Sequence, residues 1–171
     1  MIELQTERLV LRPLRPEDWP GARAFLTCTT TMRYLGGVQY EADAWRTFAS
    51  WLGMWQLTPA AMFAVIEKAS GEWIGRIGPW HPLRWPVREV GWGLRREWTG
   101  RGLAYEAAKA SVAYAHETLG WDTVSHLIDD ANHSSQRLAE RLGAEPGETV
   151  RLPGSLSGTR VRVWRQGRVR S

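Results

Sequence analysis

Residues 91–104 read Gly-Trp-Gly-Leu-Arg-Arg-Glu-Trp-Thr-Gly-Arg-Gly-Leu-Ala, and no other part of the chain is as informative about its architecture. It leads directly into the alanine-rich stretch 105–119, so the pattern predicts a strand, a glycine-rich turn and the start of a helix. Free backbone N–H groups converge at a helix N-terminus, where the helix dipole adds partial positive charge. The order of elements therefore predicts a site for a phosphate-bearing cofactor, unless the glycines only make the bend of a plain connection.

Two common phosphate-binding loops do not fit this stretch. A P-loop closes with Lys-Ser or Lys-Thr, whereas Gly102 is followed by Leu103 and Ala104. A dinucleotide-binding fingerprint lies on the first strand of a βαβ unit and is followed by an acidic residue. Gly91 and Gly93 lie instead within an expected strand past the middle of the chain. Neither loop type explains the pattern.

The stretch resembles the acyl-coenzyme A loop of the GNAT N-acetyltransferase superfamily, whose pattern is Gln/Arg-x-x-Gly-x-Gly/Ala at the end of the fourth strand. The matching residues here are Thr99, Gly100, Arg101, Gly102, Leu103 and Ala104. Thr99 departs from the usual Gln or Arg, which removes a side-chain contact near the pyrophosphate but leaves the backbone cradle. Residues 4–18 and 132–143 are similar to the first strand and helix, and to the second cofactor motif, of the branch that includes the ribosomal-protein N-terminal acetyltransferases.

This resemblance implies a fold and an activity. The fold is a single α+β (α/β) domain over residues 1–171, with a mixed, mostly antiparallel sheet of about seven strands and helices on both faces. Its fourth and fifth strands run parallel and splay apart. The activity is transfer of an acetyl group from acetyl-coenzyme A, as co-substrate and without a metal, to a primary amine by direct transfer in a ternary complex. The amine would be a protein N-terminus or a small molecule.

The resemblance also assigns the cofactor-binding residues. The loop 99–104 would hold the pyrophosphate. The Asn132 amide would bond the pantetheine arm, although capping of a helix is enough to explain an asparagine there, and Ser135 would reach the sulfur. Backbone N–H groups freed by the splay would meet the thioester and the pantetheine, and they belong to Trp92, Gly93 and Leu94. Glycine within a strand often marks such a close approach of the backbone.

Acyl transfer to an amine also needs a proton acceptor. An amine of pKa about 10 binds mainly as the cation and must lose a proton before it can attack. Glu89, on the strand that leads into the loop, is the candidate general base, acting through a water. It could instead attract the cation or pair with a neighbouring arginine such as Arg88. His81 and His133 are rival bases because of the usual pKa of histidine.

The general acid is less constrained by the sequence. Many GNAT enzymes carry a tyrosine seven positions after the asparagine of the second motif, and that position here is Ala139. Ser135 could protonate the leaving sulfur, and a thiol of pKa about 8.5 also leaves as a thiolate without an acid. The missing tyrosine keeps open an alternative function, a non-catalytic acyl-CoA-binding or sensing module.

Length and composition limit the class of protein. The chain has 171 residues, 43% of them hydrophobic and 23% charged, which is typical of one globular domain with a sizeable core. Because neither a membrane-spanning apolar run nor a secretory signal is present, we expect a cytoplasmic enzyme with no membrane contact. Cys28 is the single cysteine, which excludes an intrachain disulfide and a multi-cysteine zinc site. We expect it to pack in the core of the first helix.

The net charge is +4, which suits an anionic cofactor or a polyanionic partner. The arginines are densest near the C-terminus, at Arg160, Arg162, Arg165, Arg168 and Arg170. If Val161 and Val163 face inward on a terminal strand, these arginines line a solvated face. We prefer this interpretation to nucleic-acid binding.

Periodicity predicts the remaining elements. Strands are expected at 7–14, 61–67, 73–77, 87–94 and 124–128, with two more around Val150 and at 161–164. Helices are expected after Asp18 as the N-cap, over 41–57, from Leu103 to Leu119, and from Asn132 to a stop at Gly143. The loop 78–86 would shape an acceptor pocket or cover a sheet edge. The tryptophans of helix 41–57 would serve a homodimer interface or the domain's own core.

Overall fold

The computed structural model describes residues 2–168. The strands are β1 (Leu4–Gln5), β2 (Leu9–Arg12), β3 (Phe63–Glu67), β4 (Trp73–Trp80), β5 (Glu89–Leu94), β6 (Thr123–Ile128), β7 (Glu145–Arg151) and β8 (Arg160–Gly167). The α-helices are α1 (Trp19–Leu26), α2 (Thr29–Met32), α3 (Glu41–Leu57), α4 (Leu103–Glu117) and α5 (His133–Arg141). Short 3-10 helices are η1 (Pro16–Asp18), η2 (Arg96–Trp98) and η3 (Gly154–Leu156).

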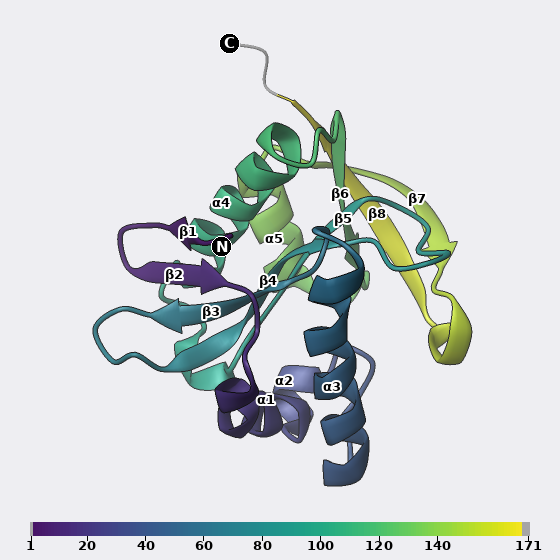
Figure 1. Ribbon diagram of the computed structural model, residues 1–171. Coiled ribbons are helices and arrows are strands. Elements are labelled where there is room, and N and C mark those ends of the chain that lie inside the picture. The colour runs from purple at the N-terminus through teal and green to yellow at the C-terminus, as the bar shows by residue number, and fades with distance from the viewer. Residues whose placement is uncertain (1, 169–171) are drawn as a thin grey trace.

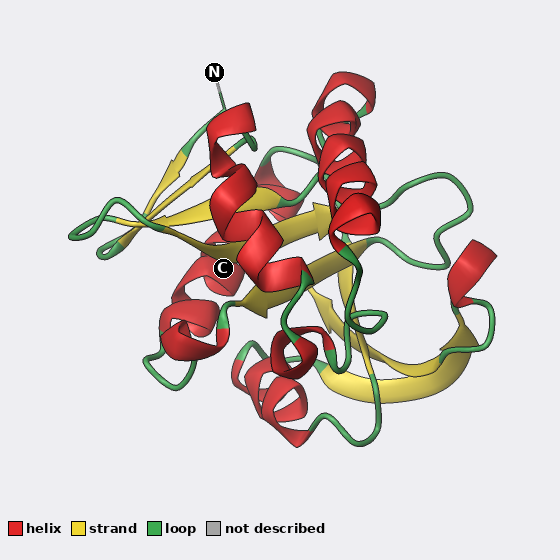
Figure 2. Ribbon diagram, turned by 90° about the horizontal axis from the view of Figure 1, so that it is seen from below, coloured by secondary structure: helices red, strands yellow, loops and turns green. Residues whose placement is uncertain are grey.

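The strands form one twisted sheet in the order β1-β2-β3-β4-β5-β6-β8-β7 (Figure 1). Neighbouring strands pair antiparallel except β5 and β6, which run parallel. Helices lie on both sides of this layer, and β7 and β8 make a long curved hairpin at its edge (Figure 2). The mixed, mostly antiparallel sheet with helices on both faces is therefore confirmed. No helix within residues 2–168 is long and apolar enough to cross a bilayer.

The sheet has eight strands where about seven were expected. The additional strand is β1, whose Leu4 and Gln5 pair with Leu11 and Val10 of β2. The first expected strand, 7–14, is correspondingly shorter and covers only Leu9–Arg12. A hydrogen bond from the Thr6 N–H to the Leu9 carbonyl (3.0 Å) closes the turn between the two strands, so that the chain folds back where a single strand was expected.

Strand β4 is longer than predicted. The expected end was residue 77, but pairing continues through Gly78, Pro79 and Trp80, which lie opposite Gly91, Val90 and Glu89. Glycine and proline usually weaken a strand interior. Here β5 supplies partners along the whole segment, so that tertiary pairing overrides the local tendency. Residues 78–80 of the expected loop 78–86 therefore belong to β4.

Two apolar cores lie on opposite faces of the sheet, since Phe63 and Val65 belong to one and Ala64 to the other. On the first face α4 packs flat through small residues, with Ala107 and Ala108 fully buried. The second face is covered by α1 and α3, whose contributions include Ala22, Phe25, Phe48 and Trp51. The helix predicted from Leu103 is confirmed, and its buried small residues fix the N-terminus of α4 against the end of β5.

Two predictions about the first helix were wrong. Asp18 does not cap α1 with its side chain, because its carboxylate accepts hydrogen bonds from the Arg12 guanidinium (2.7 and 2.8 Å) and from the Arg15 N–H (2.8 Å). It therefore ties β2 to the start of α1. Cys28 lies beyond the end of α1 and is only half-buried, since it precedes the separate turn α2.

The terminal strand β8 matches its prediction. Val161 and Val163 are buried, whereas Arg162 and Arg165 lie on the outer face and form ion pairs with Asp130 and Glu148. These two arginines thus have partners within the chain. Arg170 lies outside the described residues.

Candidate active site

The sheet opens between β5 and β6. β4 and β5 pair along the whole of β5, but β5 and β6 pair only at Glu89 and Ser125. The Ser125 N–H donates to the Arg88 carbonyl (2.9 Å), and one step further the His126 ring, through Nδ1, bonds the Val90 carbonyl (2.7 Å) in place of a strand partner. The predicted parallel, splayed pair is therefore confirmed, and it leaves one edge of β5 open beyond Val90.

Backbone alternation determines which groups face this gap. The carbonyls of Arg88 and Val90 point toward β6, whereas the N–H of Arg95 donates to Ile74 on β4 (2.8 Å). Since successive residues of a strand direct their polar groups to opposite neighbours, Trp92 and Leu94 face the gap. The backbone N–H of Gly93, which was also expected to be free, faces β4 instead.

Gly93 matters through its missing side chain. A Cβ atom at this position would lie 2.7 Å from Phe25 Cζ and 2.9 Å from Leu35 Cδ1. Real Cβ atoms do not tolerate such distances, so only glycine lets these two side chains pack against β5 here. Gly93 thereby sets how closely the α1 side of the molecule approaches the open strand.

On the α5 side of the gap, Trp92 and Ser135 form a pair. The Trp92 Nε1–H donates to Ser135 Oγ (3.1 Å), and the Trp92 ring packs against His126 with centroids 4.7 Å apart. Burial lowers the pKa of His126 to about 4, so the ring is neutral; its Nδ1–H donates to Val90, and its Nε2 accepts from Gln166 (2.8 Å). Because Ser135 Oγ accepts a hydrogen bond from the indole N–H, the hydroxyl hydrogen of Ser135 must point to another partner.

Asn132 caps α5, as predicted. Its Oδ1 accepts from the Ser135 N–H (3.3 Å) and from the Ser134 hydroxyl (3.0 Å). The amide oxygen is therefore engaged in the cap, and the amide nitrogen is the part of the side chain that would donate to a ligand. The structure brings Asn132 and Ser135 together on the first turn of one helix.

Residues 99–104 and the start of α4 form what we call the phosphate cradle. Gly100 and Gly102 both have φ of +76°, and no side chain caps the helix. A Cβ atom at Gly100 would meet no other atom within 4 Å, so the turn faces open space. Left-handed glycines before an uncapped helix N-terminus direct N–H groups at one point, and this arrangement fits the phosphates of coenzyme A.

Side chains around the cradle explain two details of its sequence. The Thr99 hydroxyl donates to the Arg96 carbonyl (2.7 Å), so this unusual residue closes the local turn. Arg8, from the other end of the domain, donates to the Arg101 carbonyl (3.0 Å) and pairs with Glu106 (2.8 Å). Sequence reasoning missed Arg8, because nothing local connects it to a loop so far along the chain.

Glu89 lies on the opposite face of β5 from Trp92. Its side chain is 7% exposed and accepts a hydrogen bond from Trp85 Nε1 (2.6 Å) and another from the backbone N–H of Leu127. Burial raises the pKa of Glu89 to about 7 against these hydrogen bonds, which favour the charged form. A carboxylate with such a pKa changes its protonation state near neutrality, as a general base requires.

Glu89 belongs to a group of side chains that we call the Arg76 cluster. Arg76 lies 4.2 Å from the Trp51 ring and 5.7 Å from the Trp80 ring, and its Nη1 is 3.0 Å from Met62 Sδ. The Trp80 ring meets Trp85 edge-on at 6.3 Å, and Trp85 in turn bonds Glu89. The members of the cluster are Trp51, Met62, Arg76, Trp80, Trp85 and Glu89. Only Glu89 was predicted as a site residue.

The family model of the acetyltransferase (GNAT) domain matches residues 8–145 of this chain. The chain belongs to the GNAT acetyltransferase family. An acetyltransferase from Agrobacterium tumefaciens str. C58 is 31% identical, with a TM-score of 0.85 over 98% of this chain and 95% of its own. An uncharacterized N-acetyltransferase of Bacillus subtilis (strain 168), YoaA, is 25% identical over 91% of this chain and 90% of its own length.

A ribosomal-protein acetyltransferase shares the fold of this GNAT domain. RimL, the ribosomal L7/L12 α-N-protein acetyltransferase in complex with coenzyme A, superposes with a TM-score of 0.77. The superposition covers 97% of this chain and 98% of that one at 14% identity. The family model confirms the predicted resemblance to the GNAT superfamily, and the likeness to RimL shows a shared fold.

The rival bases of this GNAT domain are placed differently from Glu89. His81 is exposed and its Nδ1 bonds the Val87 carbonyl (2.9 Å), while His133 is exposed at the start of α5. Arg88 was the arginine expected as an alternative partner of Glu89, and its guanidinium lies 6.0 Å from the Trp121 ring. Within residues 2–168, His, Cys, Asp and Glu side chains do not gather in groups that could hold a metal ion.

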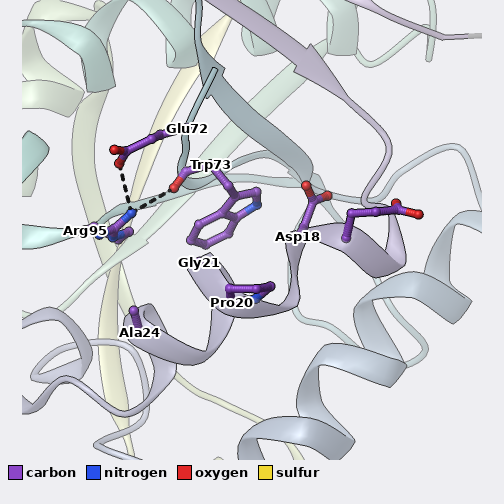
Figure 3. A pocket seen from close by; sticks show the side chains of 8 residues that line it. Asp18, Pro20, Gly21, Ala24, Glu72, Trp73 and Arg95 are labelled. Carbon is purple, nitrogen blue, oxygen red and sulfur yellow. Dashed lines mark hydrogen bonds and ion pairs between the residues drawn. The ribbon is translucent and has the colours of Figure 1, made fainter. Parts of the chain in front are cut away.

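A hollow of about 390 Å³ lies between α1 and the first residues of β4 (Figure 3). Its lining residues are Glu17, Asp18, Pro20, Gly21, Ala24, Glu72, Trp73 and Arg95. Arg95 donates to Glu72 and to the Trp73 carbonyl (both 3.3 Å), so its charge is already matched. Trp73 begins β4, whereas Trp80, opposite Glu89, ends it, so this hollow is separate from the Glu89 region.

Proposed function

We propose that this GNAT protein transfers the acetyl group of acetyl-coenzyme A directly to a primary amine in a ternary complex. One observation carries the proposal: the open edge of β5 has Glu89 on one face of the sheet and the Trp92–Ser135 pair on the other. A thioester in the gap would meet a proton acceptor on the amine side and a hydroxyl on the sulfur side.

The cofactor side of the proposal uses the phosphate cradle and α5. Backbone N–H groups of residues 100–104 would hold the pyrophosphate, as the left-handed glycines and the uncapped helix allow. The Asn132 amide nitrogen would donate to the pantetheine arm. Acetyl-coenzyme A supplies the acetyl group as a thioester, and the open N–H edge at Trp92 and Leu94 would stabilise negative charge on its carbonyl oxygen.

The amine side uses Glu89. The ionised carboxylate would accept a proton from the bound ammonium ion, directly or through a water, which frees the nitrogen lone pair. The nitrogen then forms a bond to the acetyl carbon while the carbon–sulfur bond breaks. The sulfur leaves with the bonding electrons. The nitrogen loses its second proton as the amide forms, and this proton would reach the sulfur through the Ser135 hydroxyl, which gives one proton and takes up another, or through solvent. Ala139 is buried in α5 and has no group that could act as the acid.

A panel of acceptors tests this proposal against the alternative of a non-catalytic acyl-CoA-binding module. Wild-type protein would be mixed with acetyl-coenzyme A and peptides with free N-termini, polyamines or amino acids, and free coenzyme A measured as thiol. We expect acceptor-dependent thiol release, with one acetyl group added to the amine by mass spectrometry. Binding of acetyl-coenzyme A without thiol release for any acceptor would overturn the transfer proposal and support the module.

A further inference from the structure

The Arg76 guanidinium has too few acceptors for its donors. The structure gives it a hydrogen bond to the Met62 thioether, and its Nε is buried without a partner. Within residues 2–168, Arg76 takes part in no ion pair, although Glu89 acts on it electrostatically. A guanidinium carries five N–H donors, and a thioether is a weak acceptor.

An arginine in this state is unusual, because burying a charge without hydrogen-bonded partners is unfavourable. The Trp51 and Trp80 rings hold the guanidinium in place through cation–π contacts but offer it no acceptor. A carboxylate is the group that best satisfies a guanidinium, since it accepts two parallel N–H bonds. The cluster therefore presents an oriented cation that lacks its anion.

Arg76 and Glu89 share one face of the sheet. Arg76 lies opposite Gly93, and Trp80 lies opposite Glu89, so the two charged side chains are four residues apart along the paired strands, about 13 Å between backbones. The pair between them is Gly78 and Gly91, which bears no side chains. Glu89 acts electrostatically on Arg76 across this interval, and neither residue of the glycine pair places a side chain in it.

Met62 covers the interval in the present structure. Its Cε lies 2.6 Å from where a Cβ of residue 91 would be, and Glu89 Oε1 lies 3.2 Å from the same point. A methionine side chain is flexible and rotates at low energetic cost, so a ligand could displace it.

We propose that the acceptor is a small amino carboxylic acid, whose carboxylate binds the Arg76 guanidinium while its amino group lies at Glu89. The inference rests on the proposed function, because it names the amine which that reaction acetylates. The tryptophans contact the carbon skeleton between the two charged groups. An ordinary peptide N-terminus has an amide where this acceptor has a carboxylate, and it leaves Arg76 without an anion.

Matched acceptor pairs test this assignment. Free α-, β- and γ-amino acids would be compared with their primary amides, which keep the amine and remove the carboxylate. We expect kcat/KM for the preferred acid to exceed that for its amide by about tenfold or more, as for a charge-assisted bidentate contact. In Arg76→Met the KM for the acid rises by a similar factor and the KM for the amide is unchanged. The KM of Arg76→Lys for the acid lies between those of the wild type and Arg76→Met, because lysine keeps the charge without the planar fork of the guanidinium.

The controls separate this proposal from the transfer reaction. Arg46→Met, on the exposed face of α3, keeps the wild-type preference, and all variants bind acetyl-coenzyme A equally. Calorimetric titration of the acid into protein saturated with coenzyme A repeats the comparison without turnover. Equal use of acids and amides by the wild type, preference for an amidated peptide with an acidic side chain, or acid binding unaffected by Arg76→Met would overturn the assignment. If the acid binds through Arg76 but no thiol is released, the transfer reaction fails and the binding site stands.

Discussion

The phosphate cradle follows β5 in the chain, the Arg76 cluster is built around β4 and β5, and the two are built in opposite ways. The cradle uses backbone N–H groups of contiguous residues at the surface, held by glycine geometry. The cluster uses side chains of α3, β4, β5 and the segments beside them, with two charged groups withdrawn from water. In the proposed function, the cradle would recognise a ligand by shape and dipole, while the cluster would hold buried charges for a ligand to pair with.

The largest expected effect is on turnover, and it distinguishes the Arg76 cluster from the phosphate cradle. Glu89→Gln keeps the shape of the side chain and removes the proton acceptor, so turnover should fall by about 100-fold or more. Binding of acetyl-coenzyme A, measured by calorimetry, should be unchanged, because the cradle is intact. The matched control is Glu72→Gln, an exposed carboxylate just before β4, which should keep full turnover. A comparable loss of cofactor affinity in Glu89→Gln would show that the cradle and the cluster are not independent.

A second prediction concerns the cost of holding Glu89 in the cluster. Its pKa is about 7 in the folded protein and 4.5 when unperturbed, so the native state binds more protons between these values. This contribution to stability is fully present below about pH 4.5 and is lost as pH rises through 7.

As pH rises from 5 to 8, ionisation of buried Glu89 should lower the free energy of unfolding by about 2 to 3 kcal/mol. Glu89→Gln lacks the titration and should gain stability relative to wild type over that range. Urea unfolding of both proteins across the range measures the difference. Parallel curves would mean that Glu89 is not destabilised by burial.

A third prediction addresses the cradle alone. Gly102→Val places a β-branched residue at φ of +76°, which is strained by about 1 to 3 kcal/mol. The Kd for acetyl-coenzyme A should rise by about tenfold, while turnover at saturating cofactor stays near wild type. Gly158→Val, at an exposed glycine without a positive φ, is the matched control. A Gly102 variant with normal cofactor affinity would contradict the cradle's assignment.

The smallest expected effect concerns the hydrogen bond between Trp92 of β5 and Ser135 of α5. Trp92→Phe keeps an aromatic ring against His126 and removes the hydrogen bond to Ser135. Turnover should fall by about fivefold, as for one lost hydrogen bond of about 1 kcal/mol. Trp45→Phe, on the 54% exposed Trp45 of α3, should have no effect in the same assay. An unchanged rate in Trp92→Phe would remove Ser135 from the account of the leaving sulfur.

The cradle could be predicted from the sequence because its determinants are contiguous. The glycine spacing, the strand before the loop and the alanine-rich helix after it all lie within residues 91–119, and each acts locally. The Asn132 cap was predictable for the same reason. The bend before β2 and the extension of β4 through Pro79 were missed, because pairing with a distant strand decided them.

The Arg76 cluster was not predictable beyond Glu89. The spacing of tryptophans in α3 indicated an amphipathic helix but not that Trp51 would lie against an arginine of β4. Burial of Glu89 depends on Trp85 from the preceding loop and on the Leu127 N–H from β6. Contacts between segments so far apart leave no periodic signal in a single sequence.

The pH dependence of turnover is the sharpest test of Glu89 as the general base. With both substrates saturating, kcat of the wild type should rise about tenfold per pH unit below 7 and level above it, as Glu89 ionises. Glu89→Gln should show a low kcat that does not rise with pH in this way. The same ascending limb in both proteins, or a wild-type rate independent of pH from 5.5 to 8.5, would contradict the assignment of Glu89 as the base at the open edge of β5.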